Sequence, residues 1–196
     1  AEEIDFFKEI KNTFNRFISI FAIVALGVGL FAGLKVSSRV MKKSAVPYRC
    51  NFATDDQFAL WNVIDANNDE YTWKRETTLA AAYYYYNEDG ETGGDDWLVS
   101  SPIHLEKNKI YRLKFKLQSY DVGYPEKVAV HLGTGASVAE QTTLLGDYEV
   151  ESNTFVEYKV ILPERLESGN YHISFHCHSE PYMFILYVTD VLLEEV

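Results

Sequence analysis

The segment DANND at residues 65–69 brings together the oxygen-bearing side chains of Asp65, Asn67 and Asp69. Carboxylate and amide oxygens at positions i, i+2 and i+4 of a loop can converge on a hard cation such as Ca²⁺, which takes about six to eight oxygen ligands. The segment lacks the glycine and the distal glutamate of an EF-hand loop, so distant residues must complete any such site. A turn in which these side chains bind only their own backbone is the alternative. The sequence leaves both interpretations open.

The histidine-rich segment YHISFHCH at residues 171–178 is a second candidate for chemistry. If it forms a strand, His176 and His178 share one face, because side chains two residues apart point the same way. Two imidazoles so placed can bind Zn²⁺ or Cu²⁺, or contact another ligand. The sequence shows no third metal ligand, and no serine or cysteine nucleophile in a recognisable elbow. A solvated strand face is therefore favoured over a metal site and over catalysis.

The run YYYY at residues 83–86 predicts a strand with tyrosines on both faces. Tyr83 and Tyr85 share one face, and Tyr84 and Tyr86 share the other. One pair should pack in the core and the other should point outward, where a tyrosine shelf suits stacking on a sugar or a peptide. We assign the ligand-binding role to Tyr84 and Tyr86. Exposed strand tyrosines without any ligand are the alternative.

The chain has two cysteines, Cys50 and Cys177. Both fall at core positions in the alternation of their strands, with Phe52 near one and Phe175 near the other. An even pair in an exported domain permits a disulfide, whereas two buried free thiols are equally ordinary. The pair is therefore a candidate disulfide whose Cα separation the sequence does not fix.

Alternating apolar and polar residues across 46–196 predict the strands that position these side chains. The alternation is clear at 111–117 and at 128–132, as expected for half-buried strands. Further strands are expected at Leu79–Tyr86, Trp97–Ser100, Thr142–Val150, Phe155–Leu162, Tyr171–His178 and Met183–Leu193. Clusters of Gly, Pro, Asn and Asp separate them. Many short strands with hardly any helical periodicity predict an all-β fold, an antiparallel β-sandwich.

Residues 1–45 form a separate region, predicted to be an N-terminal membrane anchor. From Phe17 to Leu34 the chain runs for 18 residues without a charge, enough for a transmembrane-type α-helix of about 27 Å. Gly29 and Gly33 have the small-xxx-small spacing that lets two membrane helices approach closely, although glycine is common in membrane helices generally. A signal peptide is the rival interpretation, but the long acidic leader and the missing cleavage site favour a retained anchor.

The two regions on either side of residue 45 also differ in net charge. The 196-residue chain carries −11, but residues 1–45 carry +3 and residues 46–196 carry −14. An acidic domain repels phosphate backbones, so nucleic-acid binding is disfavoured. The sequence also shows no paired catalytic carboxylates, nucleophile triad, P-loop or dinucleotide-binding fingerprint, so we expect no enzyme.

The dipeptide Arg16-Phe17 immediately precedes the apolar run. With this feature, residues 5–45 resemble the first transmembrane segment of bacterial ABC transporter permeases of the lipoprotein-export and cell-division type. The resemblance implies a cytoplasmic N-terminus and an extracytoplasmic domain after the helix. No further membrane helix follows in the sequence, so a complete permease is not expected.

Five ordered blocks span most of residues 46–196. They are PYRCNFATDDQFALWNVIDANNDEYTWKRE, DDWLVSSPIHLEKNKIYRLKFKL, YPEKVAVHLGT, GNYHISFHCHSE and LYVTDVLLEEV. These blocks resemble the choice-of-anchor or cleaved-adhesin jelly-roll modules of bacterial surface proteins, including those fused to gingipain-type proteases. The resemblance implies a galactose-binding-like jelly-roll sandwich that serves adhesion or ligand binding without catalysis. It also implies that Asp190, on the last strand, supplies an oxygen to the calcium site.

We therefore expect a bacterial, membrane-anchored, extracytoplasmic adhesin-like module that binds glycan or protein ligands. The alternative is an accessory or truncated permease-type subunit of an ABC transporter, with the sandwich sensing substrate. A carbohydrate-binding module of a hydrolase is a third interpretation, which would require a catalytic domain that this sequence does not contain.

Overall fold

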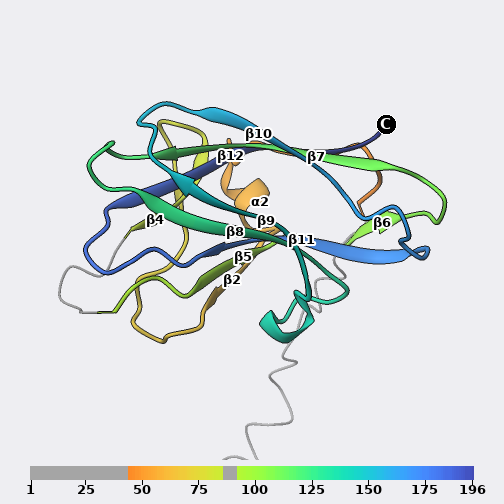
Figure 1. The fold of residues 1–196 in the computed structure, drawn as a ribbon, viewed down its shortest axis with the longest axis horizontal. Coiled ribbons are helices and arrows are strands. Elements are labelled where there is room, and N and C mark those ends of the chain that lie inside the picture. The colour runs from red at the N-terminus through yellow and green to blue at the C-terminus, as the bar shows by residue number, and fades with distance from the viewer. Residues whose placement is uncertain (1–43, 86–91) are drawn as a thin grey trace, which may run out of the picture. The chain divides into compact units, whose positions relative to one another are not determined.

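A computed structural model of the chain describes residues 44–85 and 92–196 (Figure 1). The predicted transmembrane helix, with Gly29 and Gly33, lies outside these residues, and so does Tyr86. Among the described residues, no helix is long and apolar enough to span a membrane.

The described residues form two antiparallel sheets of six strands each. In sheet 1 the strand order is β10-β7-β12-β4-β3, with β1 also paired to β12, and in sheet 2 it is β2-β5-β11-β8-β9, with β6 also paired to β11. The strands of sheet 1 are β1 (Tyr48–Cys50), β3 (Lys74–Glu76), β4 (Ala81–Tyr85), β7 (Tyr111–Ser119), β10 (Val156–Ile161) and β12 (Ile185–Glu195). The strands of sheet 2 are β2 (Asn62–Asp65), β5 (Asp96–Val99), β6 (Ile103–Leu105), β8 (Glu126–Gly133), β9 (Thr143–Val150) and β11 (Gly169–Cys177). The connections include a short helix α2 (Asp55–Phe58) and a 3-10 helix η1 (Val138–Glu140).

The two sheets pack face to face as the two layers visible in Figure 1. After β7 the chain crosses repeatedly between them: β8 and β9 lie in sheet 2, β10 in sheet 1, β11 in sheet 2 and β12 in sheet 1. Such crossing between two antiparallel layers is typical of jelly rolls. The predicted all-β antiparallel sandwich is confirmed.

The apolar side chains that alternate along β7 fill the space between the two sheets. Leu113, Phe115 and Leu117 are fully buried, while the basic residues between them are only half-buried. The Phe115 ring meets Phe175 of β11 edge-on, with ring centroids 5.3 Å apart. Burying an apolar side chain of this size contributes about 1.5–3 kcal/mol, so contacts of this kind hold the two sheets together.

The structure adds strands that the sequence pattern does not predict and shortens one that it does. Strands β2 and β3 have four and three residues, too few for alternation to identify them. Strand β4 begins at Ala81 rather than Leu79, because Ala80 has a φ of 49° that interrupts the extended backbone. The fold also includes Ser44, just before the predicted domain start at 46, whose backbone bridges Ile103.

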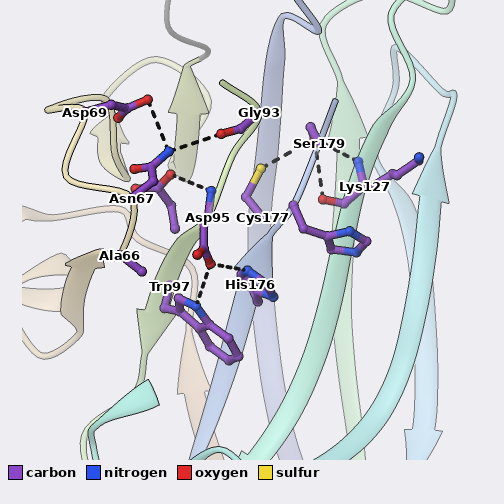
Figure 2. Close-up of polar contacts among 12 residues, drawn as sticks. Ala66, Asn67, Asp69, Gly93, Asp95, Trp97, Lys127, His176, Cys177 and Ser179 are labelled. Carbon is purple, nitrogen blue, oxygen red and sulfur yellow. Dashed lines mark hydrogen bonds and ion pairs between the residues drawn. The ribbon is translucent and has the colours of Figure 1, made fainter. Parts of the chain in front are cut away.

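The two cysteines are buried, as predicted, but both are free thiols, so the candidate disulfide is wrong. Cys50 lies on β1 of sheet 1 and Cys177 on β11 of sheet 2. The Cys177 sulfur lies 3.5 Å from the Ser179 hydroxyl instead (Figure 2). Burial raises the pKa of both thiols, which keeps them protonated and weakly reactive.

Candidate functional site

The tyrosines of β4 that point inward and outward are the reverse of those predicted. Tyr84 is 1% exposed and lies opposite Leu186, a fully buried core residue of β12. Its ring packs near Trp73, with centroids 6.3 Å apart, and burial raises its pKa. The assignment of a ligand-binding role to Tyr84 is therefore wrong, because no ligand can reach it. Tyr83 and Tyr85 occupy the outward face of β4 instead.

Six aromatic side chains gather around this outward face, and we call them the aromatic surface. They are Tyr83, Tyr85, Tyr120, Tyr124, Phe184 and Tyr187. Phe184 is central: its ring centroid lies 4.7 Å from that of Tyr120, 5.7 Å from that of Tyr85 and 5.9 Å from that of Tyr124. Tyr120 is 53% exposed and Tyr124 is 47% exposed. The surface therefore presents aromatic rings to solvent.

Paired strands hold one half of the aromatic surface. Tyr187 of β12 lies between Tyr83 of β4 and Gln118 of β7 in the sheet register, and the two tyrosine rings are 6.3 Å apart. Side chains on paired strands are more precisely placed than side chains on loops. Tyr187 is only 7% exposed, so it supports the partly exposed Tyr83 ring from the neighbouring strand. A tyrosine ring exposed in this way can stack on the apolar face of a sugar while its hydroxyl forms hydrogen bonds.

A buried acid anchors Phe184, the central ring of the aromatic surface. Glu126, at the start of β8, accepts a hydrogen bond from the Phe184 backbone N–H at 2.7 Å and one from the Ser179 hydroxyl at 2.5 Å. Burial raises the pKa of Glu126 to about 7. The acid therefore anchors the segment that leads into β12 and carries Phe184. Nothing in the local sequence indicates this long-range contact.

The predicted histidine pair lies on the outer face of sheet 2. The His176 ring stacks on Trp97, with centroids 4.0 Å apart and an interplanar angle of 7°. Asp95 accepts a hydrogen bond from the Trp97 indole at 3.3 Å and lies 2.8 Å from His176 Nε2 (Figure 2). The His178 Nε2 atom pairs with Asp147 at 2.8 Å. Each histidine therefore has its own carboxylate partner.

These histidines do not form a shared metal site. Their ring centroids are 5.5 Å apart, but Nε2 of His176 and of His178 turns toward a different aspartate. In residues 44–85 and 92–196, no group of three or more His, Cys, Asp or Glu side chains is arranged to hold a metal ion. Burial lowers the pKa of His176 despite the nearby Asp95. The pair is best described as part of the polar outer face of sheet 2.

The DANND loop forms the self-contained turn that the sequence leaves open as one alternative. Asp65 accepts hydrogen bonds from the backbone N–H groups of Asp69 at 3.2 Å and Glu70 at 2.9 Å. The Asn67 side-chain amide donates to the Asp69 carboxylate at 3.2 Å and to the Gly93 carbonyl at 3.1 Å (Figure 2). The loop is thereby tied to the segment that precedes β5.

Three buried oxygens beside the loop nevertheless have no hydrogen-bond partner of standard geometry. They are Asn67 Oδ1, Thr72 Oγ1 and Asp96 Oδ1. Asp96 is fully buried and lies directly opposite Asp65 on neighbouring strands, an arrangement that is unfavourable for two ionised acids. Burial raises the pKa of Asp96 to about 7, with Asp65 and Asp69 adding to the effect and the nearby Thr72 hydroxyl opposing it.

Asp190 does not belong to this group. It lies on β12 of sheet 1, next to an irregularity in the register between Thr189 and Leu192, and its φ is 50°. Its carboxylate pairs with Lys116 of β7 at 2.8 Å. The assignment of Asp190 to the calcium ligands is therefore wrong, and Asp96 is the acid that the register brings to the loop.

The fold and the aromatic surface together define a jelly-roll sandwich with a candidate binding face. Among solved structures, the chain is similar to the K1 cleaved adhesin domain of Lys-gingipain from Porphyromonas gingivalis W83, with a TM-score of 0.61, 19% identity and coverage of 75% of this chain and 96% of that chain. The K3 cleaved adhesin domain of the same protein gives a TM-score of 0.58 at 19% identity, with the same coverage. These similarities confirm the predicted adhesin-type jelly-roll fold.

A carbohydrate-binding structure shares the fold as well. The CBM22-2 xylan-binding domain of Xyn10C from Paenibacillus barcinonensis matches with a TM-score of 0.51 and 8% identity, covering 76% of this chain and 99% of that chain. No family model and no curated protein sequence matches this chain. The structural neighbours are thus adhesin and carbohydrate-binding domains.

Proposed function

We propose that this protein is a non-catalytic glycan-binding module and that the aromatic surface is its ligand platform. The observation that carries the proposal is the clustering of aromatic rings around Phe184, with Tyr120 and Tyr124 about half exposed. Sugars are recognised by aromatic side chains that cover their apolar faces, with a few polar groups that fix orientation. The fold of the adhesin and xylan-binding neighbours supports a binding role.

A glycan array followed by titration calorimetry on the full chain tests this proposal. Tyr120→Ala should weaken binding to any glycan found by about tenfold, because one stacking ring is lost. Leu144→Ala is the matched control, since Leu144 is 57% exposed on β9 of sheet 2. Absence of binding to every glycan on the array, or equal binding by the two variants, would contradict the proposal.

We also propose that Ca²⁺ stabilises the DANND loop through oxygens of Asp65, Asn67 and Asp69, with the buried Asp96 opposite Asp65 adding negative charge nearby. The support is the buried Asn67 Oδ1 atom, which has no hydrogen-bond partner, and the opposition of Asp65 to Asp96. A bound divalent cation would favour the ionised form of Asp96 and offset the repulsion between the acids. The role is structural and lies apart from the aromatic surface.

The cellular placement of the domain is a further proposal. A location outside the cytoplasm, with a membrane anchor in residues 1–45, rests on the apolar run of the sequence. Adding protease to intact cells tests this placement, because an extracytoplasmic domain should be digested. If residues 46–196 are fully protected in intact cells and are digested only after lysis, the placement is contradicted. The permease-subunit alternative rests on residues 5–45, outside the described residues, and co-purification with an ATPase would test it.

A further inference from the structure

A cleft of about 400 Å³ opens on the outer face of sheet 1. Arg49 of β1, Lys114 and Lys116 of β7, and Asp190 and Leu192 of β12 are among its lining residues. The register places Arg49 opposite Leu192, and Leu192 opposite Lys114. The cleft therefore has a floor of paired strands and a basic wall.

The basic character of this face stands out against the rest of the domain. Residues 46–196 carry a net charge of −14, yet the outward positions around the cleft hold more cations than carboxylates. The cations are Arg49, Arg112, Lys114, Lys116 and Lys159, and the carboxylates are Glu157, Asp190 and Glu194. The acidic remainder of the domain repels anions from other faces, so this face is where an anionic ligand would be accepted.

The ion pairs on this face leave positive charge unbalanced. Glu194 is shared by Arg112 at 2.6 Å and Lys114 at 2.7 Å. Arg49 forms no ion pair with any residue in the described part of the chain. Lys116 pairs with Asp190 at 2.8 Å and Lys159 pairs with Glu157 at 2.7 Å. Five cations therefore face three carboxylates, and Arg49 is the cation that remains available to a bound anion.

The cleft and the aromatic surface lie along the same strands. On β7 the outward side chains run from Lys114 through Lys116 to Gln118, and the exposed Tyr120 of the aromatic surface follows directly after the strand. Alternate residues on a strand are about 7 Å apart. One oligosaccharide can therefore span the aromatic rings and the basic cleft together.

We propose that this cleft binds the carboxylate or sulfate group of an acidic glycan, whose neighbouring sugars stack on the aromatic surface. The Arg49 guanidinium is the anchor, because its planar fork matches two oxygens of a carboxylate or sulfate. Lys114 and Lys116 supply further positive charge, and the Leu192 side chain covers the ligand's apolar side. The inference rests on the proposed glycan-binding function and names its ligand class.

Titration of the full chain with four polymers tests the inference: polygalacturonate for carboxylate, chondroitin sulfate for sulfate, neutral xylan, and poly-L-glutamate as a non-sugar polyanion. At least one acidic glycan should bind more tightly than xylan, and added salt should weaken that binding. Arg49→Ala should weaken it about tenfold, while leaving any xylan binding unchanged. Arg49→Lys should restore only part of the affinity.

Lys107→Ala is the control for net charge, since Lys107 is an exposed cation that pairs with Glu167 elsewhere on the surface. Equal loss of acidic-glycan binding in Lys107→Ala and Arg49→Ala would overturn the inference, because the effect would then be one of overall charge. Xylan bound as tightly as both acidic glycans would overturn it while sparing the proposed function. If poly-L-glutamate binds as tightly as the acidic glycans, the assignment of the ligand as a sugar is overturned. If the unmodified chain binds none of the glycans, both this inference and the proposed function are overturned.

Discussion

The carboxylate of Glu126 accepts a hydrogen bond from the backbone N–H of Phe184 at 2.7 Å. Glu126 is fully buried at the start of β8 in sheet 2, whereas Phe184 is the central ring of the aromatic surface beside sheet 1. Phe184 precedes β12, so sheet hydrogen bonds do not hold it. Glu126 therefore anchors the segment that carries Phe184 in the proposed ligand platform.

Glu126→Ala should lower the free energy of unfolding by about 3 kcal/mol, because the Phe184 N–H and the Ser179 hydroxyl lose their buried acceptor. Glycan binding should weaken as well, since Phe184 is no longer held in place. Urea unfolding and glycan titration measure the two effects. Glu126→Gln keeps an acceptor oxygen and should retain most of the binding. A folded Glu126→Ala variant with unchanged glycan affinity would show that the acid does not position the platform.

Stability should fall as the pH rises from 5 to 8. Burial raises the pKa of Glu126 and of Asp96 to about 7, so each acid holds its proton more tightly in the folded chain than in the unfolded chain. The stability that this proton contributes is present at low pH and is lost as the pH rises through 7. At about 1.4 kcal/mol per pKa unit, each acid should account for about 2–3 kcal/mol over this range.

The comparison with Glu126→Gln isolates this effect. His176, whose pKa is lowered by burial, acts in the opposite direction at the acid end of the range, and it is present in both proteins. Unfolding free energies from urea titrations at pH 5, 6.5 and 8 should converge between the natural chain and the variant as the pH falls if Glu126 is protonated there. If the unfolding free energies of the two proteins changed in parallel with pH, the pKa of Glu126 would not be raised in the folded chain.

Calcium should raise the melting temperature, and EDTA should lower it, if the loop binds the ion as proposed. A ligand present at 100 times its dissociation constant contributes about 2.7 kcal/mol to stability. Asp96→Asn should abolish the response, because it removes the buried carboxylate, while Glu151→Gln, at an exposed acid, should preserve it. Differential scanning calorimetry at pH 8 gives the readout. A melting temperature that changes with neither calcium nor EDTA would contradict calcium binding by the loop.

The sequence predicts which residues share a face better than it predicts which face is inward. Alternation correctly identifies β7, and it correctly separates Tyr83 and Tyr85 from Tyr84. The choice between the two faces is made by the neighbouring strand, because Tyr84 lies opposite the buried Leu186. That pairing joins segments a hundred residues apart, and no local pattern contains it.

The same limit explains what the sequence misses at the candidate sites. Asp96 joins the DANND loop through the pairing of β2 with β5, and the resemblance instead indicated Asp190, which the structure places beside Lys116. Tyr120 comes from a segment between strands, where alternation carries no information, and Phe184 precedes β12, which begins at Ile185 rather than at the predicted Met183. The density of aromatic residues around these turns is the signal that could have identified the aromatic surface.

Both thiols should remain unreactive until the chain unfolds. Cys177 is fully buried and Cys50 is 4% exposed, and burial raises the pKa of each, so the reactive thiolate is scarce. A thiol reagent such as DTNB should therefore label neither cysteine in the native chain and both in guanidinium. Mass spectrometry of a non-reduced digest should find the Cys50 and Cys177 peptides separate, even after air oxidation of the folded protein. A linked peptide in high yield would mean that β1 and β11 approach within disulfide distance, which would require the two sheets to pack differently around Phe52 and Phe175.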